Sequence, residues 1–247
     1  MPTALVAGAT RGIGRGFVEA LLQRDWSVYA SYRHAGSAQA LDELSRRHPG
    51  QLRQVPLDLT DEDSIRATVA QIESELLEPL ELGLCCAGLL HEGDQRPEKS
   101  LAKLSPDWFQ RSMAVNGLGP LLLLKHLHPL LVHHTSSQYA VISARVGSIT
   151  ENQLGGWYSY RASKAALNML MKTAAIEMGR RFPHLQLLCL HPGTTDTELS
   201  EPFSARVPRE KLFSVECTVH QLLQVLEDNR GGESGRFLSW DGSELPW

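Results

Sequence analysis

Short apolar runs alternate with longer stretches of helical periodicity along the whole chain, and no other feature constrains the fold as much. We predict strands over residues 3–7, 27–31, 52–57, 81–87, 139–143 and 186–191. These runs lack an in–out alternation of apolar and polar residues, which is typical of strands that helices cover on both faces. We predict helices over residues 13–24, 38–47, 64–76, 106–131 and 156–182, and a last helix and strand near 215–227 and 236–239.

This order of elements indicates βαβ units with right-handed crossovers, and therefore an α/β fold with a doubly wound parallel sheet. A length of 247 residues fits one large domain, and no repeat or low-complexity tract divides the chain. We therefore expect a single domain over residues 1–247. One irregular segment, residues 194–214, follows a strand and contains two prolines.

Composition narrows the classes of function. The net charge of −4 argues against a nucleic-acid partner, or an anionic membrane, bound through bulk charge. The longest apolar stretch, residues 118–124, is too short to cross a bilayer. The N-terminus lacks the basic start and cleavage site of a signal peptide, so we expect a cytoplasmic protein.

No metal site is expected. The four cysteines have no CxxC or zinc spacing and are interpreted as reduced, mostly buried thiols. Four histidines gather near the end of a predicted helix, at His126, His128, His133 and His134. Their spacings do not place them on one helix face, and we see no acidic partner nearby. An interaction with the helix dipole explains them better.

A glycine-rich turn, GATRGIG over residues 8–14, joins the first strand to the first helix. Glycines at such a turn let the backbone approach a pyrophosphate, which rests on free N–H groups at the helix N-terminus. A phosphate loop is excluded because no Gly-Lys-Ser/Thr follows. A purely structural turn is the alternative. We assign to a dinucleotide site Gly8, Arg11, Gly12, Ile13 and Gly14.

The second strand ends without the acidic residue that bonds the ribose 2′-hydroxyl of NAD. Arg33, together with Arg11, offers guanidinium donors for a 2′-phosphate instead. Two solvated arginines are the plain alternative. We therefore expect NADP(H) in preference to NAD(H).

Tyr160 and Lys164 lie four residues apart at the start of a long predicted helix, so they share one helix face. A neighbouring ammonium favours phenolate, and we expect it to lower the pKa of the Tyr160 phenol. Such a tyrosine can donate a proton to a carbonyl oxygen or remove one from an alcohol. The spacing alone is weak evidence, and its position after a strand of a dinucleotide-binding sheet strengthens it.

A series of motifs in this order resembles the short-chain dehydrogenase/reductase family over essentially the whole chain. The series consists of the glycine turn, Asp58, Ala87-Gly88, Asn116, Tyr160-x-x-x-Lys164 and Pro192-Gly193. Residues 145–149, 155–160 and 235–247 are similar to the C-factor-like branch, which includes sniffer-type carbonyl reductases. The resemblance implies a Rossmann fold.

The resemblance also implies roles for individual residues. Asn116 would hold a water or a helix kink that connects Lys164 to solvent as a proton relay, and Lys164 would also bond the nicotinamide ribose. The residues expected along the adenosine and ribose are Asp58, Leu59, Ala87 and Gly88. Those expected to clasp the nicotinamide and pyrophosphate are Pro192, Gly193, Thr195 and Thr197.

The sequence departs from the family at two strand ends. Cys85-Cys86 replaces the usual Asn-Asn before Ala87-Gly88. Ala144 occupies the position of the catalytic serine. In a regular strand the Ser143 side chain would point away from the candidate site, although a β-bulge could turn it inward. Ser148 in the following loop is another candidate for the catalytic serine. Loss of one such donor can cost roughly 10²–10³ in rate.

These observations predict an NADPH-dependent carbonyl reductase or alcohol dehydrogenase acting on a small or medium ketone or aldehyde. Leu89, Leu90 and residues 194–214 are expected to border the substrate. Trp157 and Tyr158 either line the same pocket or are core or interface aromatics. The alternative is a dinucleotide-binding signalling or regulatory protein with little turnover. The two longest predicted helices carry more apolar surface than one sheet face covers, which suggests a homo-oligomer, a dimer or tetramer.

Overall fold

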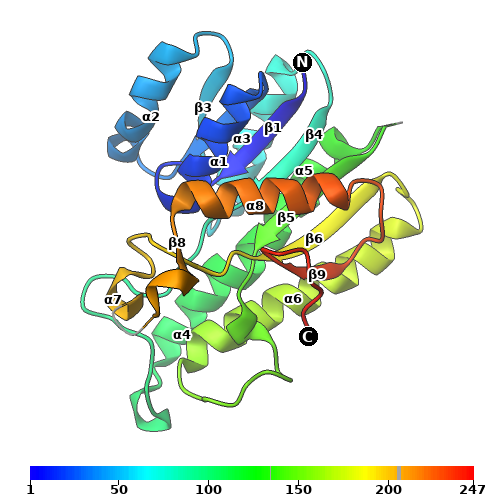
Figure 1. The fold of residues 1–247 in the computed structure, drawn as a ribbon. Helices are drawn as coiled ribbons and strands as arrows, with labels where there is room; N and C mark the ends of the chain where they lie inside the picture. Colours follow the sequence, from blue (N-terminus) through cyan, green and yellow to red (C-terminus); the bar gives the residue numbers. More distant parts are fainter. Residues whose placement is uncertain (134, 205–206) are drawn as a thin grey trace.

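Seven parallel strands form one sheet with the order β3-β2-β1-β4-β5-β6-β9 (Figure 1). The computed structural model describes residues 1–133, 135–204 and 207–247. The strands are β1 (Thr3–Ala7), β2 (Ser27–Tyr32), β3 (Leu52–Pro56), β4 (Leu80–Cys85), β5 (Ser137–Ile142), β6 (Leu185–His191) and β9 (Arg236–Ser239). The direction of the strand order reverses between β1 and β4. The predicted doubly wound fold is confirmed.

Helices cover both faces of this sheet (Figure 1). One layer consists of α1 (Gly12–Gln23), α2 (Ala35–Arg47) and α8 (Val215–Asp228). The other consists of α3 (Glu62–Glu75), α5 (Gly119–Leu131) and α6 (Tyr158–Gly179). In β1, Leu5 packs in the core on the α5–α6 side and Val6 in the core on the α1–α8 side. Burial on both faces explains why the strands show no polar alternation.

The predicted helix over residues 106–131 is wrong as a single element. It consists of α4 (Pro106–Met113), a π-helical turn (Ala114–Leu118) and α5. At Gly119 the backbone passes so close to another segment that an added Cβ would lie 2.8 Å from the Leu59 carbonyl oxygen. The π-helical turn carries Asn116, which is completely buried. The resemblance implied a water or a helix kink at this residue, and the structure has a π-helical turn there.

The helix predicted from residue 156 begins later, at Tyr158. The three preceding residues have left-handed backbone angles, with φ of 61° at Gly155, 67° at Gly156 and 54° at Trp157. Right-handed helix cannot include such residues, so the chain enters α6 through a sharp turn.

The expected lack of an acidic partner for the histidine cluster is also wrong. The Oε1 atom of Glu62 in α3 lies 2.8 Å from His126 Nε2 and 2.7 Å from Lys125 Nζ. Hydrogen bonds from Lys125 and His126 lower the pKa of Glu62 to about 2. This partner is 64 residues away in the sequence, so the local pattern could not reveal it. His134 lies outside the described residues.

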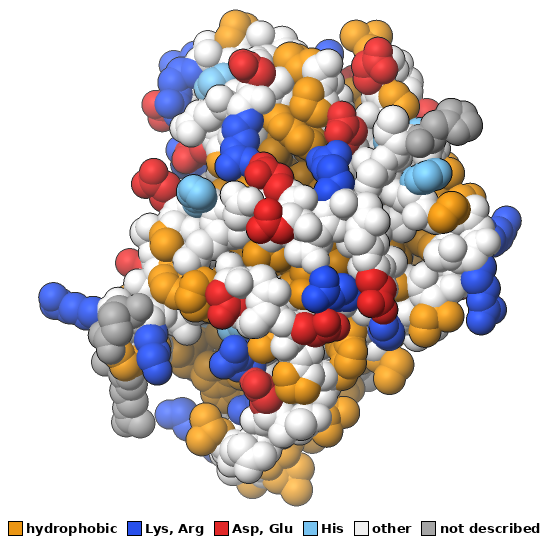
Figure 2. All heavy atoms as spheres, turned by 45° about the vertical axis from the view of Figure 1, so that its right-hand side comes forward, with side chains coloured by type: hydrophobic (Ala, Val, Ile, Leu, Met, Phe, Trp, Pro, Cys, Tyr) orange, Lys and Arg blue, Asp and Glu red, His pale blue; other side chains and the backbone are white. Residues whose placement is uncertain are grey.

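Charged side chains of both signs are interspersed on the face shown in Figure 2. Among the described helices, none combines the length and apolar character needed to span a bilayer.

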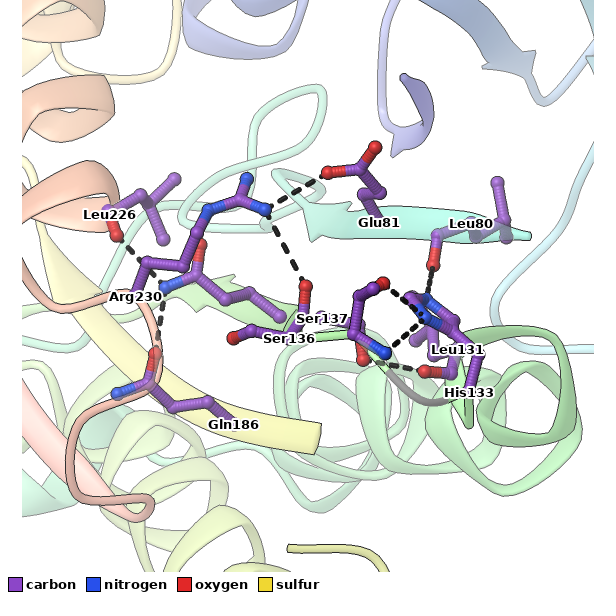
Figure 3. A network of polar contacts seen from close by, with 11 residues as sticks. Leu80, Glu81, Leu131, His133, Ser136, Ser137, Gln186, Leu226 and Arg230 are labelled. Atoms are coloured by element: carbon purple, nitrogen blue, oxygen red, sulfur yellow. Dashed lines mark hydrogen bonds and ion pairs between the residues drawn. The ribbon is translucent and has the colours of Figure 1, made fainter. Parts of the chain in front are cut away.

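A polar network ties together the amino ends of the strands (Figure 3). Arg230, which follows α8, donates to Glu81 of β4 at 3.0 Å. Ser137 and Gln138 of β5 donate to the carbonyl oxygens of Leu131 and Leu226. Ligands of open α/β sheets bind at the opposite edge, so this network is structural.

Candidate cofactor and catalytic site

The carboxyl ends of β1, β4, β5 and β6 meet at one edge of the sheet, where the strand order reverses. Ligands of such sheets bind at this position. The glycine turn follows β1, Ala87-Gly88 follows β4, and Pro192-Gly193 follows β6. Helix α6, which carries Tyr160 and Lys164, packs against this sheet on the same side as α5.

The glycine turn is built for close backbone approach. Gly8 has φ 78°, and a Cβ there would lie 2.7 Å from the Ala87 nitrogen. A Cβ on Gly14 would lie 2.1 Å from the Gly8 carbonyl oxygen. Helix α1 begins at Gly12, and the side chain of its N-cap residue Arg11 does not cap it. Uncapped N–H groups at a helix N-terminus can hold an anionic group.

Thr197 and Glu198 come close to this turn from the segment after β6. A Cβ on Gly12 would meet Thr197 Cγ2 at 3.3 Å. The Arg11 guanidinium donates to Glu198 Oε2 at 2.6 Å. Thr195 is buried and shares a 2.8 Å hydrogen bond with Thr218 of α8. The segment therefore lies beside the candidate cofactor site, as the resemblance implied for its threonines.

Gly193 also has a positive φ, 71°, and a Cβ there would lie 2.7 Å from the Phe213 ring. Residues 194–214 contain β7 (Thr194–Thr195), α7 (Glu201–Ser204), a 3₁₀ turn (Arg209–Lys211) and β8 (Leu212–Phe213), and residues 205 and 206 lie outside the described part. The two short strands pair with each other.

Arg33 follows β2 and Asp58 follows β3, so both lie at the carboxyl ends of the strands, and the charge of Arg33 acts on Asp58. Burial opposes ionisation of Asp58, but hydrogen bonds from Thr60 and the charges of Arg33 and Arg111 outweigh it and lower the pKa of Asp58. The Asp58 carboxylate accepts from the Thr60 nitrogen at 2.8 Å. Arg33 is exposed and contacts His34. The Arg33 guanidinium therefore lies just after the carboxyl end of β2.

Asn116 joins two parts of the candidate site. Its Oδ1 accepts from the Leu89 nitrogen, and its Nδ2 donates to the Leu89 oxygen, both at 2.7 Å. Nδ2 also donates to Ser163 of α6 at 3.0 Å. A Cβ on Gly88 would lie 3.8 Å from Asn116 Oδ1 and 3.9 Å from Lys164 Nζ. The fold thus brings together Gly88, Asn116 and Lys164.

Tyr160 and Lys164 are both buried, with 9% and 2% of their surface exposed. The Lys164 ammonium donates to the Ile142 oxygen at 2.8 Å and lies 5.8 Å from the centre of the Tyr160 ring. Burial lowers the pKa of Lys164 to about 8. Burial also raises the pKa of Tyr160 to about 12, so the expectation of a lowered value is wrong for this arrangement. The reason is that the ammonium bonds a carbonyl oxygen while the phenol is shielded from water.

The two serine candidates have other partners. Ser143 Oγ donates to Asn168 Oδ1 of α6 at 2.6 Å. Ser148 Oγ donates to the Trp247 oxygen at 3.2 Å. Within the described part of the chain, neither hydroxyl bonds Tyr160. The assignment of Ser143 therefore stays a prediction.

Ser163, which the sequence pattern did not single out, is completely buried. Its Oγ donates to the main-chain carbonyl oxygen of Tyr160 at 2.8 Å and accepts from Asn116 Nδ2. Its position three residues after Tyr160 places it on the inner face of the helix, but one spacing cannot distinguish a site residue from a buried one.

Aromatic side chains surround Tyr160. The Trp157 ring lies 6.2 Å from the Tyr160 ring and 5.0 Å from the Phe203 ring of α7. The His91 ring lies 6.0 Å from Phe203. Trp157 therefore packs beside Tyr160, whereas Tyr158 is exposed.

Known proteins are similar to this chain in sequence and in fold. Residues 2–207 match the family model described as short chain dehydrogenase. A relative is the 1-hydroxy-2-glutathionyl-2-methyl-3-butene dehydrogenase of Rhodococcus sp. (strain AD45), 29% identical over 253 residues that cover 100% of both chains. C-signal of Myxococcus xanthus is 33% identical over 137 residues, 56% of this chain and 77% of that protein.

A solved structure of a carbonyl reductase is also similar to this chain. NADPH-bound carbonyl reductase from chicken fatty liver superposes with a TM-score of 0.88 at 30% identity, and the match covers 100% of this chain and 99% of that one. The similarity to C-signal supports the expected C-factor-like branch. The matched model spans most of the sequence, and the chain belongs to the short-chain dehydrogenase family.

Proposed function

We propose that this protein is a carbonyl reductase or alcohol dehydrogenase that transfers hydride between a nicotinamide and a small or medium ketone or aldehyde. The observation that carries the proposal is the convergence of Gly88, Asn116, Tyr160 and Lys164 beside the glycine turn. Membership of an oxidoreductase family and the likeness to a carbonyl reductase support it.

The residues present fit a dinucleotide. The N-terminus of α1 is not capped by Arg11, so its first N–H groups can bind an anionic group such as a pyrophosphate. When bound, the nicotinamide supplies or accepts the hydride. We propose that Gly8, Gly12, Ile13 and Gly14 hold the pyrophosphate. The remaining proposed contacts are Arg11, Arg33, Asp58, Leu59, Ala87, Gly88, Asn116, Tyr160, Lys164, Pro192, Gly193, Thr195 and Thr197.

Arg33 supports a preference for NADP(H) over NAD(H), because a guanidinium beside the ribose attracts a 2′-phosphate. Arg11 is held by Glu198, so it would have to exchange this partner to add a second donor. The NADPH in the chicken carbonyl reductase structure agrees with this preference.

In the reducing direction Tyr160 is the proton donor. With a pKa of about 12 its phenol is protonated at neutral pH, and the proton passes to the carbonyl oxygen as the alcohol forms. Lys164, with a pKa of about 8, is mostly an ammonium at pH 7. It bonds the Ile142 oxygen, so it would have to turn toward the phenol oxygen to stabilise negative charge there. Asn116 holds the loop after Gly88 against α6, which keeps Lys164 and the loop in register.

The proposal is tested by Tyr160→Phe. We expect this variant to lose about 10²–10⁴-fold in kcat for NADPH oxidation across a panel of ketones, aldehydes and quinones. Its dissociation constant for NADPH should change less than about twofold, since the glycine turn is untouched. Tyr29→Phe is the matched control, because Tyr29 lies within β2 and packs in the core. Wild-type turnover in Tyr160→Phe would refute the role of the phenol.

The second candidate is a dinucleotide-binding signalling or regulatory protein with little turnover. Ala144 at the serine position, the other partners of Ser143 and Ser148, and the similarity to C-signal favour it. NADPH binding without turnover on any member of the carbonyl panel would support this candidate over the first.

We also propose a homo-oligomer, a dimer or a tetramer, in the cytoplasm. A groove of about 340 Å³ lies between α5 and α6 and is lined by Leu121, Leu122 and Phe182 among others. Met169 and Ile176 on α6 are exposed. All four cysteines are free, which agrees with a reducing compartment.

A further inference from the structure

Glu98 is a buried carboxylate at the beginning of the catalytic helix. It lies in the loop between β4 and α4, and only 2% of its surface is exposed. Its Oε2 accepts from the Ser159 nitrogen at 3.2 Å, and its Oε1 accepts from the Ser159 hydroxyl. Its main-chain oxygen accepts from the Trp157 nitrogen at 2.5 Å. One residue thus makes three bonds to the entry of α6.

Helix α6 needs such a partner because its own N-cap residue cannot cap it. The side chains of Asp61, Ser105 and Ser214 cap α3, α4 and α8 respectively. The N-cap of α6 is Trp157, whose indole has a donor and no acceptor, and it makes no side-chain cap bond. Glu98 supplies the missing acceptor from 61 residues away.

The cap acts on the turn that carries Tyr160. The first N–H groups of a helix have no intrahelical partner, and an uncapped first turn frays. Tyr160 is the third residue of α6, next to the residue that Glu98 binds. Glu98 takes part in none of the ion pairs of the described residues. A negative charge at the N-terminus of a helix such as α6 is favourable.

The same loop is fixed at a second point. Leu89, nine residues before Glu98, is held by Asn116. The loop is therefore attached to the π-helical turn at one place and to α6 at the other. Asn116 also contacts α6 through Ser163, so both attachments bear on the segment from Tyr160 to Lys164.

We propose that Glu98 is a positioning residue for Tyr160, which acts by capping the first turn of α6 from the loop after β4. This proposal rests on the proposed function of Tyr160 as the proton donor. Glu98 itself does not touch the reacting atoms.

The experiment compares Glu98→Ala, Glu98→Gln and Ser159→Ala in the full chain. Glu98→Ala should lower kcat about 10- to 100-fold, because small displacements of a catalytic group are costly. The dissociation constant for NADPH should stay within about twofold, since Glu98 bonds the entry of α6 and not the glycine turn. Glu98→Gln keeps an acceptor oxygen for the Ser159 nitrogen and should recover most of the loss. Ser159→Ala removes one donor and should lose less than Glu98→Ala.

Asp94→Asn is the matched control, because Asp94 is an exposed carboxylate of the same loop. It should keep wild-type kcat. In the background of Tyr160→Phe, Glu98→Ala should cause less than about a twofold further loss, since the two residues act as a unit. Equal losses in both backgrounds, or wild-type kcat in Glu98→Ala, would overturn the proposal.

Hydrogen exchange separates this proposal from the proposed function. In Glu98→Ala the amides of residues 158–161 should exchange at least about tenfold faster, while those of residues 165–175 keep their rates. If the wild type fails to oxidise NADPH with every carbonyl compound of the panel, the proposed function fails. The exchange rates then still decide whether Glu98 holds the first turn of α6. Unchanged exchange at residues 158–161 would refute the cap.

Discussion

Replacing Asn116 by alanine should destabilise the protein more than any exposed asparagine does. The side chain is completely buried and makes three hydrogen bonds, two to Leu89 at 2.7 Å and one to Ser163 at 3.0 Å. Each bond contributes about 1 kcal/mol net, and an unsatisfied buried Leu89 N–H adds about 1–3 kcal/mol. The expected loss in the free energy of unfolding is therefore about 4–6 kcal/mol.

Urea unfolding followed by tryptophan fluorescence measures this loss. Asn152→Ala is the control, because Asn152 is exposed and makes one bond, to the Gly155 nitrogen at 3.1 Å. It should lose less than about 1 kcal/mol. Asn116→Asp should be at least as unstable as Asn116→Ala at pH 7, since a carboxylate cannot donate to Leu89 or Ser163. A loss under about 1 kcal/mol in Asn116→Ala would refute the reasoning that a buried amide network holds the loop.

Three further predictions concern charge. Because the pKa of Lys164 is about 8, kcat for reduction should be constant below about pH 7 and fall above pH 8 as the ammonium deprotonates. Lys164→Arg should remove that fall, and a flat pH profile in the wild type would contradict the prediction. Burial lowers the pKa of His191 to about 4, so the unfolded state binds the proton more readily; stability should be full above about pH 6.5 and fall as pH drops toward 4, and urea titrations of His191→Asn should show a smaller fall. Arg33→Glu should shift the ratio of NADPH to NADH affinity toward NADH by at least about tenfold, measured by fluorescence titration, and an unchanged ratio would exclude Arg33 from cofactor choice.

Much of the architecture follows from local patterns. The apolar runs predicted all seven strands of the main sheet within a few residues, because strands buried on both faces have an unmistakable composition. The helix over residues 106–131 was the main error. A π-helical turn has the same residues as an α-helix and differs only in which carbonyl each N–H meets, so composition cannot reveal it.

Within the candidate site, the structure agrees with the predictions based on backbone conformation. It agrees less well with the predictions based on side-chain direction. Gly8 has the positive φ and the close neighbours that its place in the turn implied. Ser143 and Ser148 each have a partner that the sequence does not suggest, Asn168 and Trp247. The side chain of a strand-end residue takes whichever partner the packed helix presents, which depends on distant residues.

The sequence by itself determined the βαβ order, the glycine turn and the shared helix face of Tyr160 and Lys164, because periodicity and backbone sterics act over a few residues. Only the tertiary structure decided that Asn116 binds Leu89, that Glu98 caps α6, and that burial raises the pKa of Tyr160 to about 12. These features depend on contacts between residues 27 and 61 positions apart, and on how completely other segments exclude water. Local sequence propensity gives no information about these long-range contacts or about the exclusion of water.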